Sequence, residues 1–279
     1  KTFTVAAGLE EGLIETDTEF LNLEKRLRCG KSIISEYDKK IPSDLTVEQI
    51  LIRSGNIGAV RIGQKLKIDK LKLFLEKIGV LNKIDFDIEE VGQPIPFRWG
   101  KCKLATVSFG HGITTTPLQL AKGYAIIANG GFEIKPSLIK KSTGNNQDRK
   151  RVIKEGVSKK INKILRKIVT TKEGTAGLAN IKGYEIGGKT GTAEKAVVGG
   201  YTRKAKVNTF ASIFPTSKPK YVMIVLLDEP KTSEDYIYEF KNKIGFYKGT
   251  PFNTAGWTSV EVAGKIIQKN GPILATKYL

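Results

Sequence analysis

The chain has 279 residues, 40% of them hydrophobic, which is ordinary for a globular protein and fits one large folded domain or a domain with a smaller lobe. Its longest apolar run, residues 221–227, is too short to span a bilayer and indicates a buried strand. The formal net charge is +19, but it is mostly lysine spread thinly along the chain, without a basic stripe interleaved with aromatic residues, so we expect no nucleic-acid partner.

The N-terminal part of the chain predicts one buried helix followed by an irregular stretch. Residues 1–11 carry closely spaced apolar side chains and predict a mostly buried helix that ends at Gly12. Residues 13–40 mix short apolar pieces with charged residues and look irregular. A short helix then follows, for which Ser43 or Asp44 is the expected cap.

Helices in close succession predict an all-helical lobe. The short helix stops at residues 54–56, with the sequence Ser-Gly-Asn. A second helix is expected over residues 57–66 and a third over residues 71–78, which Gly79 closes.

The middle of the chain predicts a loop and then a well-capped helix. Residues 85–101 form a loop that contains prolines and carries Trp99. Thr116 is a typical cap, and Pro117 is favoured at the first helical position. The helix that follows is expected to end at residues 129–131, with the sequence Asn-Gly-Gly.

Strands are expected late in the chain, after a polar loop over residues 142–151 and an amphipathic helix over residues 157–169. The expected elements are a strand that starts at Tyr184, a glycine-rich turn at 198–201, strands at 208–214 and 220–227, and a closing helix at about 255–269. Helices first and strands later indicate an α+β protein built on an antiparallel sheet.

Two cysteines, Cys29 and Cys102, lie far apart in the sequence and define no disulfide framework. We expect both thiols to be free and at least partly buried, with a disulfide between them as the open alternative. A single histidine and two separate cysteines offer no cluster of metal ligands, so we expect neither a metal nor a cofactor.

The stretch from Gly187 to Glu194 combines small residues, a cation and hydroxyls on one predicted strand. Lys189, Thr190 and Thr192 are separated by little bulk, because Gly191 has no side chain. A second extended chain could approach such a strand closely and pair with it as an added strand.

Three short motifs carry the chemistry in a set order. Lys1 starts a helix, Ser54-Gly55-Asn56 lies at a helix terminus, and Lys189-Thr190-Gly191 lies on a strand. Penicillin-recognising serine enzymes carry Ser-x-x-Lys, Ser-x-Asn and Lys-Thr-Gly in this order. The serine of the first motif falls three residues before Lys1 in that pattern, so we expect the chain to start just after the nucleophile.

The chain resembles class B penicillin-binding proteins, closest to the septal D,D-transpeptidases of cell division (the penicillin-binding protein 3 type). The resemblance runs from Lys1 to about Lys269 and is carried by residues 1–12, 108–113, 116–120, 187–192 and 228–230. It implies the penicillin-binding/β-lactamase-like fold, which is α+β, with an antiparallel sheet flanked by helices and an all-helical lobe. It also implies that residues 1–279 form a single transpeptidase domain.

The resemblance assigns a role to each site residue. Lys1 takes the proton of the nucleophilic serine, and Ser54 relays it to the departing amine. Asn56 binds the substrate amide and Lys189 supplies positive potential. Thr190, Gly191 and Thr192 form the strand that binds the substrate carboxylate, and the backbone N–H of Thr192 contributes to the oxyanion hole.

The partners implied by the resemblance belong to cell-wall synthesis. They are peptidoglycan stem peptides that end in D-Ala-D-Ala, β-lactam antibiotics, and a glycosyltransferase and other division proteins that bind the full-length protein. The implied location is the periplasmic face of the bacterial inner membrane, where an N-terminal helix outside this sequence is the anchor.

Several alternatives stay open at this point. A β-lactamase or a D,D-carboxypeptidase shares the three motifs, and a penicillin-sensing or scaffolding domain would form an acyl-enzyme without turnover. Ser54 and Asn56 could merely cap adjoining helices. Ser137 and Ser217 also begin formal Ser-x-x-Lys matches, which we interpret as chance, and we interpret His111 as a packing or loop residue.

Overall fold

The computed structural model describes residues 1–279 except 31, 140–149, 198–199, 240–245 and 277–279. Its main helices are α1 (Thr2–Glu10), α2 (Val47–Ile52), α3 (Asn56–Lys77), α4 (Lys101–Ser108), α5 (Pro117–Ala128), α6 (Glu155–Thr170) and α7 (Ser259–Thr276). Its strands are β1 (Glu19–Phe20), β2 (Arg26–Cys29), β3 (Ser32–Ser35), β4 (Leu45–Thr46), β5 (Gly187–Val197), β6 (Gly200–Phe214), β7 (Tyr221–Asp228), β8 (Ile237–Glu239) and β9 (Phe246–Lys248).

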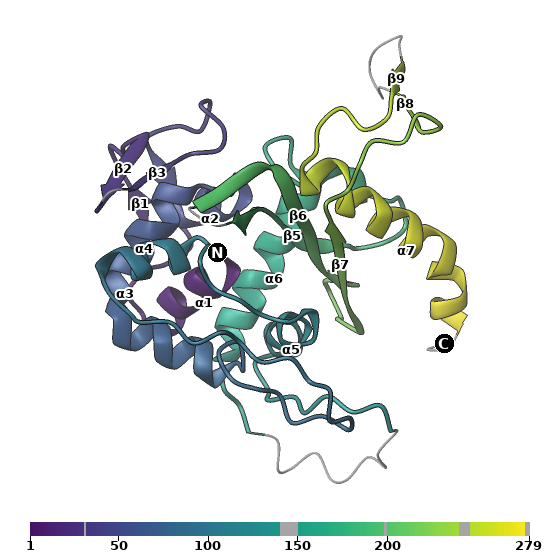
Figure 1. Ribbon diagram of the computed structural model, residues 1–279. Coiled ribbons are helices and arrows are strands. Elements are labelled where there is room, and N and C mark those ends of the chain that lie inside the picture. Colours follow the sequence, from purple (N-terminus) through teal and green to yellow (C-terminus); the bar gives the residue numbers. More distant parts are fainter. Residues whose placement is uncertain (31, 140–149, 198–199, 240–245, 277–279) are drawn as a thin grey trace.

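The largest sheet is antiparallel and has the order β5-β6-β7. Helices α5 and α6 pack against it on the side of the helical lobe, and α7 lies on the opposite side (Figure 1). The predicted hairpin is therefore confirmed, although β5 starts at Gly187 rather than Tyr184 and β6 is longer than expected. Strand β6 pairs with one side of β5, and no strand within the described residues pairs with the other side, so the sheet has an open edge there.

The first helix, α1, fills the centre of the helical lobe. Val5, Ala6 and Ala7 are fully buried, and the helix packs against α3, α6 and α2. As predicted, the chain turns away at Gly12, whose positive φ of 65° suits glycine. The N-terminal end of α1 consequently lies between the helical lobe and the sheet (Figure 1).

The cap of α2 is Thr46, and the prediction of Ser43 or Asp44 was wrong. Thr46 Oγ1 accepts from the backbone N–H of Gln49 at 3.2 Å, and the Gln49 side chain accepts from the N–H of Thr46 at 2.9 Å. This reciprocal capping box satisfies two N–H groups at once. Asp44 instead accepts from the backbone N–H of Asn22.

The two helices predicted after residue 56 form one element, α3, with a break at Lys67, where φ is 61°. Gly79 closes this helix as expected, with φ of 79°. The polar loop predicted over residues 142–151 falls largely on residues 140–149, which lie outside the described residues.

Two corrections concern the helical lobe. Residues 13–40 contain the strands β1, β2 and β3, of which β2 and β3 form a hairpin. The predicted loop over residues 85–101 is followed directly by helix α4. The strands have two to four residues and α4 has eight, so each element is too short for a periodic pattern to indicate it.

The expectation of free thiols was also wrong. Cys29, at the end of β2, forms a disulfide with Cys102 in α4, with a Cα–Cα distance of 5.4 Å. The two residues are 73 positions apart in the sequence, and tertiary packing alone brings them together. The disulfide therefore ties the β2–β3 hairpin to the helical lobe.

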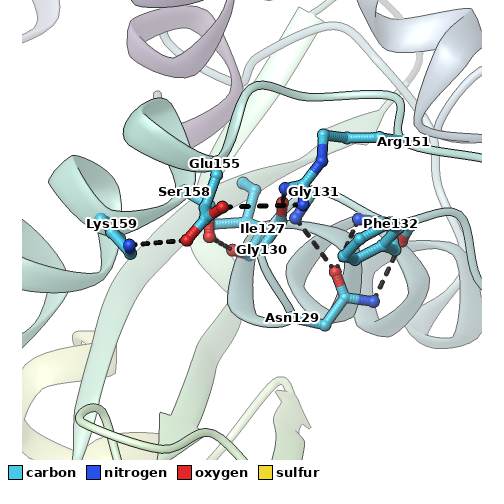
Figure 2. Close-up of polar contacts among 9 residues, drawn as sticks. All are labelled: Ile127, Asn129, Gly130, Gly131, Phe132, Arg151, Glu155, Ser158 and Lys159. Carbon is cyan, nitrogen blue, oxygen red and sulfur yellow. Dashed lines mark hydrogen bonds and ion pairs between the residues drawn. The ribbon is translucent and has the colours of Figure 1, made fainter.

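The junction between α5 and α6 is held by polar contacts that surround Asn129 and Ser158 (Figure 2). The cap at Thr116, the position of Pro117 and the end of α5 at residues 129–131 are all confirmed. Asn129 Oδ1 accepts from the backbone N–H groups of Gly131 and Phe132, and Ser158 Oγ donates to the Ile127 carbonyl. These bonds fix α6, which packs directly against β5.

Candidate active site

The motifs predicted from the sequence meet where α1, the α2–α3 turn and β5 converge. Lys189 Nζ donates to Ser54 Oγ at 2.7 Å, and both side chains are buried, with relative exposures of 6% and 7%. The same ammonium lies 3.1 Å from the Thr190 carbonyl oxygen. Lys1 is close enough for its charge to act on Lys189. Residues from both ends of the sequence therefore form one polar cluster.

Ser54 occupies a tight turn between two helices. Its φ of 60° lies in the left-handed region, which is uncommon for residues other than glycine. Hydrogen bonds from Ser54 N to the Leu51 carbonyl and from Gly55 N to the Ile50 carbonyl close the turn. The turn directs the Ser54 hydroxyl at Lys189 on β5, and such local strain is frequent at functional sites.

Asn56 is the first residue of α3 and is held by the chain that leaves β3. Its Nδ2 donates to the Ser35 carbonyl at 2.8 Å, and its backbone N–H donates to the Glu36 carboxylate at 2.7 Å. Within the part of the chain that the structure describes, Asn56 Oδ1 has no hydrogen-bond partner. That oxygen can accept from a bound amide.

Strand β5 presents a mixed surface of buried, partly exposed and exposed residues. Lys189 is buried, Thr190 is partly exposed, and Gly191 and Thr192 are exposed. Thr190 Oγ1 shares a 2.7 Å hydrogen bond with Thr175 Oγ1. Thr192 Oγ1 accepts from the backbone N–H of Ala255 at 2.9 Å, so its own proton can be donated to a ligand.

Two of the three glycines of β5, Gly188 and Gly191, have different functions in packing. A Cβ on Gly188 would lie 2.5 Å from the buried ring of Phe210, so this glycine permits close packing within the sheet. A Cβ on Gly191 would meet nothing closer than the Thr209 carbonyl oxygen at 4.0 Å. The space beside Gly191 is therefore open to another chain.

Burial governs the electrostatics of the two lysines. It lowers the pKa of Lys1 to about 8, against the opposing effect of the Glu36 carboxylate. Burial, together with the charge of Lys1, holds the pKa of Lys189 well below its ordinary value. A lysine with a pKa near 8 is partly neutral at neutral pH and can accept a proton from a hydroxyl.

Aromatic side chains lie near both ends of the site. The ring of His111 stacks on Phe109 with centroids 5.8 Å apart, and the Lys1 ammonium lies 5.9 Å from the Phe109 centroid. Near Thr192, the ring of Trp257 packs edge-on against Tyr238 with centroids 5.0 Å apart. These rings are placed to form walls beside the cluster.

The serines of the two other Ser-x-x-Lys matches lie in loops, and Lys140, the lysine of the first match, lies outside the described residues. Ser137 Oγ donates to the Asp87 carboxylate at 2.6 Å, and the backbone N–H of Ser217 donates to Glu185. Neither serine starts a helix. Ser217 therefore lacks the helical spacing that places a lysine beside a serine, and Ser137 lies outside any helix.

Sequence reasoning missed Glu36 and Thr175, because both lie outside any periodic element and act only through tertiary contacts. Among the described residues, no three His, Cys, Asp or Glu side chains are grouped to hold a metal ion. Nor does any helix in the described ranges have the length and apolar character needed to cross a membrane.

The family is established by comparison with known proteins. Residues 1–245 match the model of the penicillin-binding protein transpeptidase domain, and the chain belongs to this family. The predicted family and the predicted α+β penicillin-binding fold are both confirmed.

Individual relatives agree with this assignment. The chain is 31% identical over 286 residues to a probable peptidoglycan D,D-transpeptidase FtsI of Caulobacter vibrioides, covering 99% of this chain and 46% of that protein. The transpeptidase domain of Burkholderia pseudomallei penicillin-binding protein 3 superposes with a TM-score of 0.83 at 24% identity, covering 98% of this chain and 77% of that one. Penicillin-binding protein 3 of Mycobacterium tuberculosis, solved with aztreonam, gives 0.78 at 23% identity, with coverages of 97% and 61%. The chain spans about half the length of the curated relatives it matches.

Proposed function

We propose that this chain is the acyl-transfer domain of a serine-type peptidoglycan D,D-transpeptidase. The observation that carries the proposal is the buried hydrogen bond from Lys189 to Ser54, beside a Lys1 whose pKa is lowered to about 8. A buried amine of this kind can serve as a general base for a hydroxyl nucleophile, which is the chemistry of acyl transfer.

The proposed reaction has two steps. The nucleophile is the serine that the family pattern places three residues before Lys1. Its oxygen attacks the carbonyl carbon between the two terminal D-Ala residues while Lys1 accepts its proton. The C–N bond then breaks, the proton passes through Ser54 to the departing D-Ala amine, and an acyl-enzyme remains. An amine of a second stem peptide then attacks the acyl carbon, the C–O bond to the serine breaks, and a proton of the amine passes to the serine oxygen, which restores the serine.

Substrate binding is assigned to the open edge of β5. An extended stem peptide pairs with this strand beside Gly191, where a side chain is absent and space is open. The hydroxyls of Thr190 and Thr192 bind the terminal carboxylate, with Lys189 supplying positive charge, and Asn56 binds the amide. The backbone N–H of Thr192 stabilises the oxyanion. A β-lactam occupies the same position and acylates the same serine.

We further propose that the protein acts at the septum, on the periplasmic side of the inner membrane, together with a glycosyltransferase and other division proteins. The name of the Caulobacter relative supports the septal assignment. The Cys29–Cys102 disulfide supports an oxidising compartment, because such bonds persist mainly outside the reducing cytoplasm.

The proposal is tested with a fluorescent penicillin. The 279-residue chain is compared with a longer chain that also contains the upstream residues, including the expected Ser-x-x segment before Lys1. Covalent labelling of the extended chain alone is the expected result. Labelling of the printed chain would mean that another serine acts, and a lack of labelling in both would overturn the proposed function.

A further inference from the structure

Three consecutive residues, the last of β3 and the two that follow it, hold the turn that carries Ser54. The Ser35 carbonyl accepts from Asn56 Nδ2, and the Tyr37 hydroxyl donates to the Arg53 carbonyl at 3.1 Å. Between them, Glu36 accepts two hydrogen bonds: Oε2 accepts from the backbone N–H of Asn56 at 2.7 Å, and Oε1 accepts from that of Ile57 at 2.8 Å. The Glu36 carboxylate therefore uses both oxygens on this one turn.

The turn needs such a partner because it has no cap of its own. The residue at the N-cap of α3 is Gly55, which offers no side chain to the first N–H groups of the helix. A carboxylate at a helix N-terminus also interacts favourably with the helix dipole. Glu36 supplies both interactions from a segment that is distant in sequence from α3.

Glu36 is also the carboxylate that acts on Lys1. Burial lowers the pKa of Lys1, and the negative charge of Glu36 counteracts part of that decrease. Besides burial, the charge of Lys1 in turn lowers the pKa of Lys189 on β5. Glu36 therefore contacts the turn through hydrogen bonds, and its charge acts on Lys1.

The position of Glu36 is itself secured. It follows the β2–β3 hairpin, and the disulfide from Cys29 to Cys102 ties this hairpin to α4. Helix α4 in turn packs against α3, the helix that Glu36 caps.

We propose that Glu36 is a positioning residue of the acyl-transfer site, which holds the Ser54–Asn56 turn through its backbone N–H groups and places one negative charge beside Lys1. This inference rests on the proposed function for its catalytic consequence. The hold on the turn itself does not depend on that function.

The catalytic consequence is measured as the second-order rate constant of acylation by a penicillin across pH, in the chain extended through its upstream serine. Glu36→Gln keeps the size of the side chain, but it loses the charge and turns an amide donor toward a backbone N–H. We expect its maximal rate to fall by about 10- to 100-fold, as for small misplacements of catalytic groups. Without the carboxylate the pKa of Lys1 falls further, so the acid limb of the profile moves to lower pH.

Two further variants separate this effect from general damage. Glu36→Asp keeps the charge, and we expect it to keep the acid limb near the wild-type position and to recover part of the rate. Asp38→Asn removes a carboxylate two residues away that accepts from Lys40 N, and it should behave as wild type. A uniform loss in Glu36→Gln with an unmoved acid limb, or a rate equal to wild type, would overturn the proposal.

Amide hydrogen exchange of Asn56 and Ile57, resolved by NMR in the printed chain, tests the hold on the turn without any catalysis. Faster exchange at both amides in Glu36→Gln, with no change in Asp38→Asn, is the expected result. Unchanged exchange would overturn the proposal even if penicillin labelling succeeds. If the wild-type extended chain is not labelled, the proposed function fails, and exchange still decides whether Glu36 holds the turn.

Discussion

The hydrogen bond from Lys189 Nζ to Ser54 Oγ, 2.7 Å long, joins the sheet to the helical lobe in the interior of the protein. It connects residues 135 positions apart, and both are buried. The bond therefore depends on the correct packing of the two parts of the molecule. A shift of either part would separate the cation from the hydroxyl.

Replacing Lys189 should separate activity from stability. We expect Lys189→Met to reduce the rate of penicillin acylation by about 100-fold or more, because it removes a preorganised charge from the site. The free energy of unfolding should change by less than about 1 kcal/mol, since the lost hydrogen bond is offset by relief from burying a cation. Acylation kinetics and urea unfolding measure the two effects. Lys195→Met is the matched control on the same strand, because Lys195 forms ion pairs with Asp228 and Glu229 at the surface. A similar loss of acylation rate in this variant would contradict the prediction.

The pH dependence of acylation should follow Lys1. Its pKa of about 8 means that the ammonium loses its proton as the pH rises through 8, and only the neutral amine can accept the proton of a serine. The rate should therefore rise between about pH 7 and pH 9 and then level off. The pKa of Lys1 is about 8 in the folded state, and its ordinary value is 10.5. Between these two pH values the unfolded chain binds more protons than the folded protein, so the protein should become more stable as the pH rises from 8 to 10.5. Stopped-flow measurement of acylation across this pH range checks the expected rise in rate. A rate that does not depend on pH would contradict it.

The disulfide should contribute measurably to stability. Because it closes a loop of 73 residues, we expect its loss to lower the free energy of unfolding by about 2–4 kcal/mol. Urea unfolding with and without a reductant measures this difference. The double variant Cys29→Ala/Cys102→Ala is the control, since it should be less stable and should not respond to the reductant. Equal unfolding midpoints for oxidised and reduced wild type would contradict the prediction.

Two alanine substitutions on β5 should have opposite consequences. In Gly188→Ala the new methyl group would lie 2.5 Å from the Phe210 ring and 2.6 Å from the Ala211 carbonyl oxygen, so we expect a loss of about 1–3 kcal/mol in stability. In Gly191→Ala the methyl group enters open space. This variant should fold as wild type but should be acylated more slowly, because the methyl group obstructs the approach of the ligand to the strand. A destabilised Gly191→Ala, or one that is acylated normally, would contradict this reading of the edge.

The elements with strong local signals could be predicted from the sequence. The cap at Thr116 and Pro117, the amphipathic pattern of α6 and the apolar runs of β6 and β7 all follow from nearest neighbours in the chain. The β2–β3 hairpin and α4 lack such patterns, and they were missed. The cap at Thr46 was misplaced because Ser43 and Asp44 offered equally good capping side chains nearby.

The residues of the site likewise divide into those that the sequence indicated and those that it did not. The residues of the Ser54–Asn56 and Lys189–Gly191 tripeptides could be named in advance from these motifs, and Lys1 and Thr192 from the family resemblance. The structure brings Ser54 and Lys189 together. Glu36 and the burial of Lys189 could not be foreseen, because both depend on which distant segments pack around the turn. Local sequence thus indicates the candidate site residues, and tertiary packing determines their charge environment.

The bond between Cys29 and Cys102 also makes a covalent ring out of the segment between them. Ser54 and Asn56 lie inside this ring, whereas Lys1 and Lys189 lie on the two arms outside it. A single proteolytic cut in the largely exposed loop between α3 and α4 would open the ring without releasing either fragment. A nicked molecule therefore keeps its two pieces covalently joined for as long as the bond stays oxidised, and after reduction only non-covalent packing would hold them together.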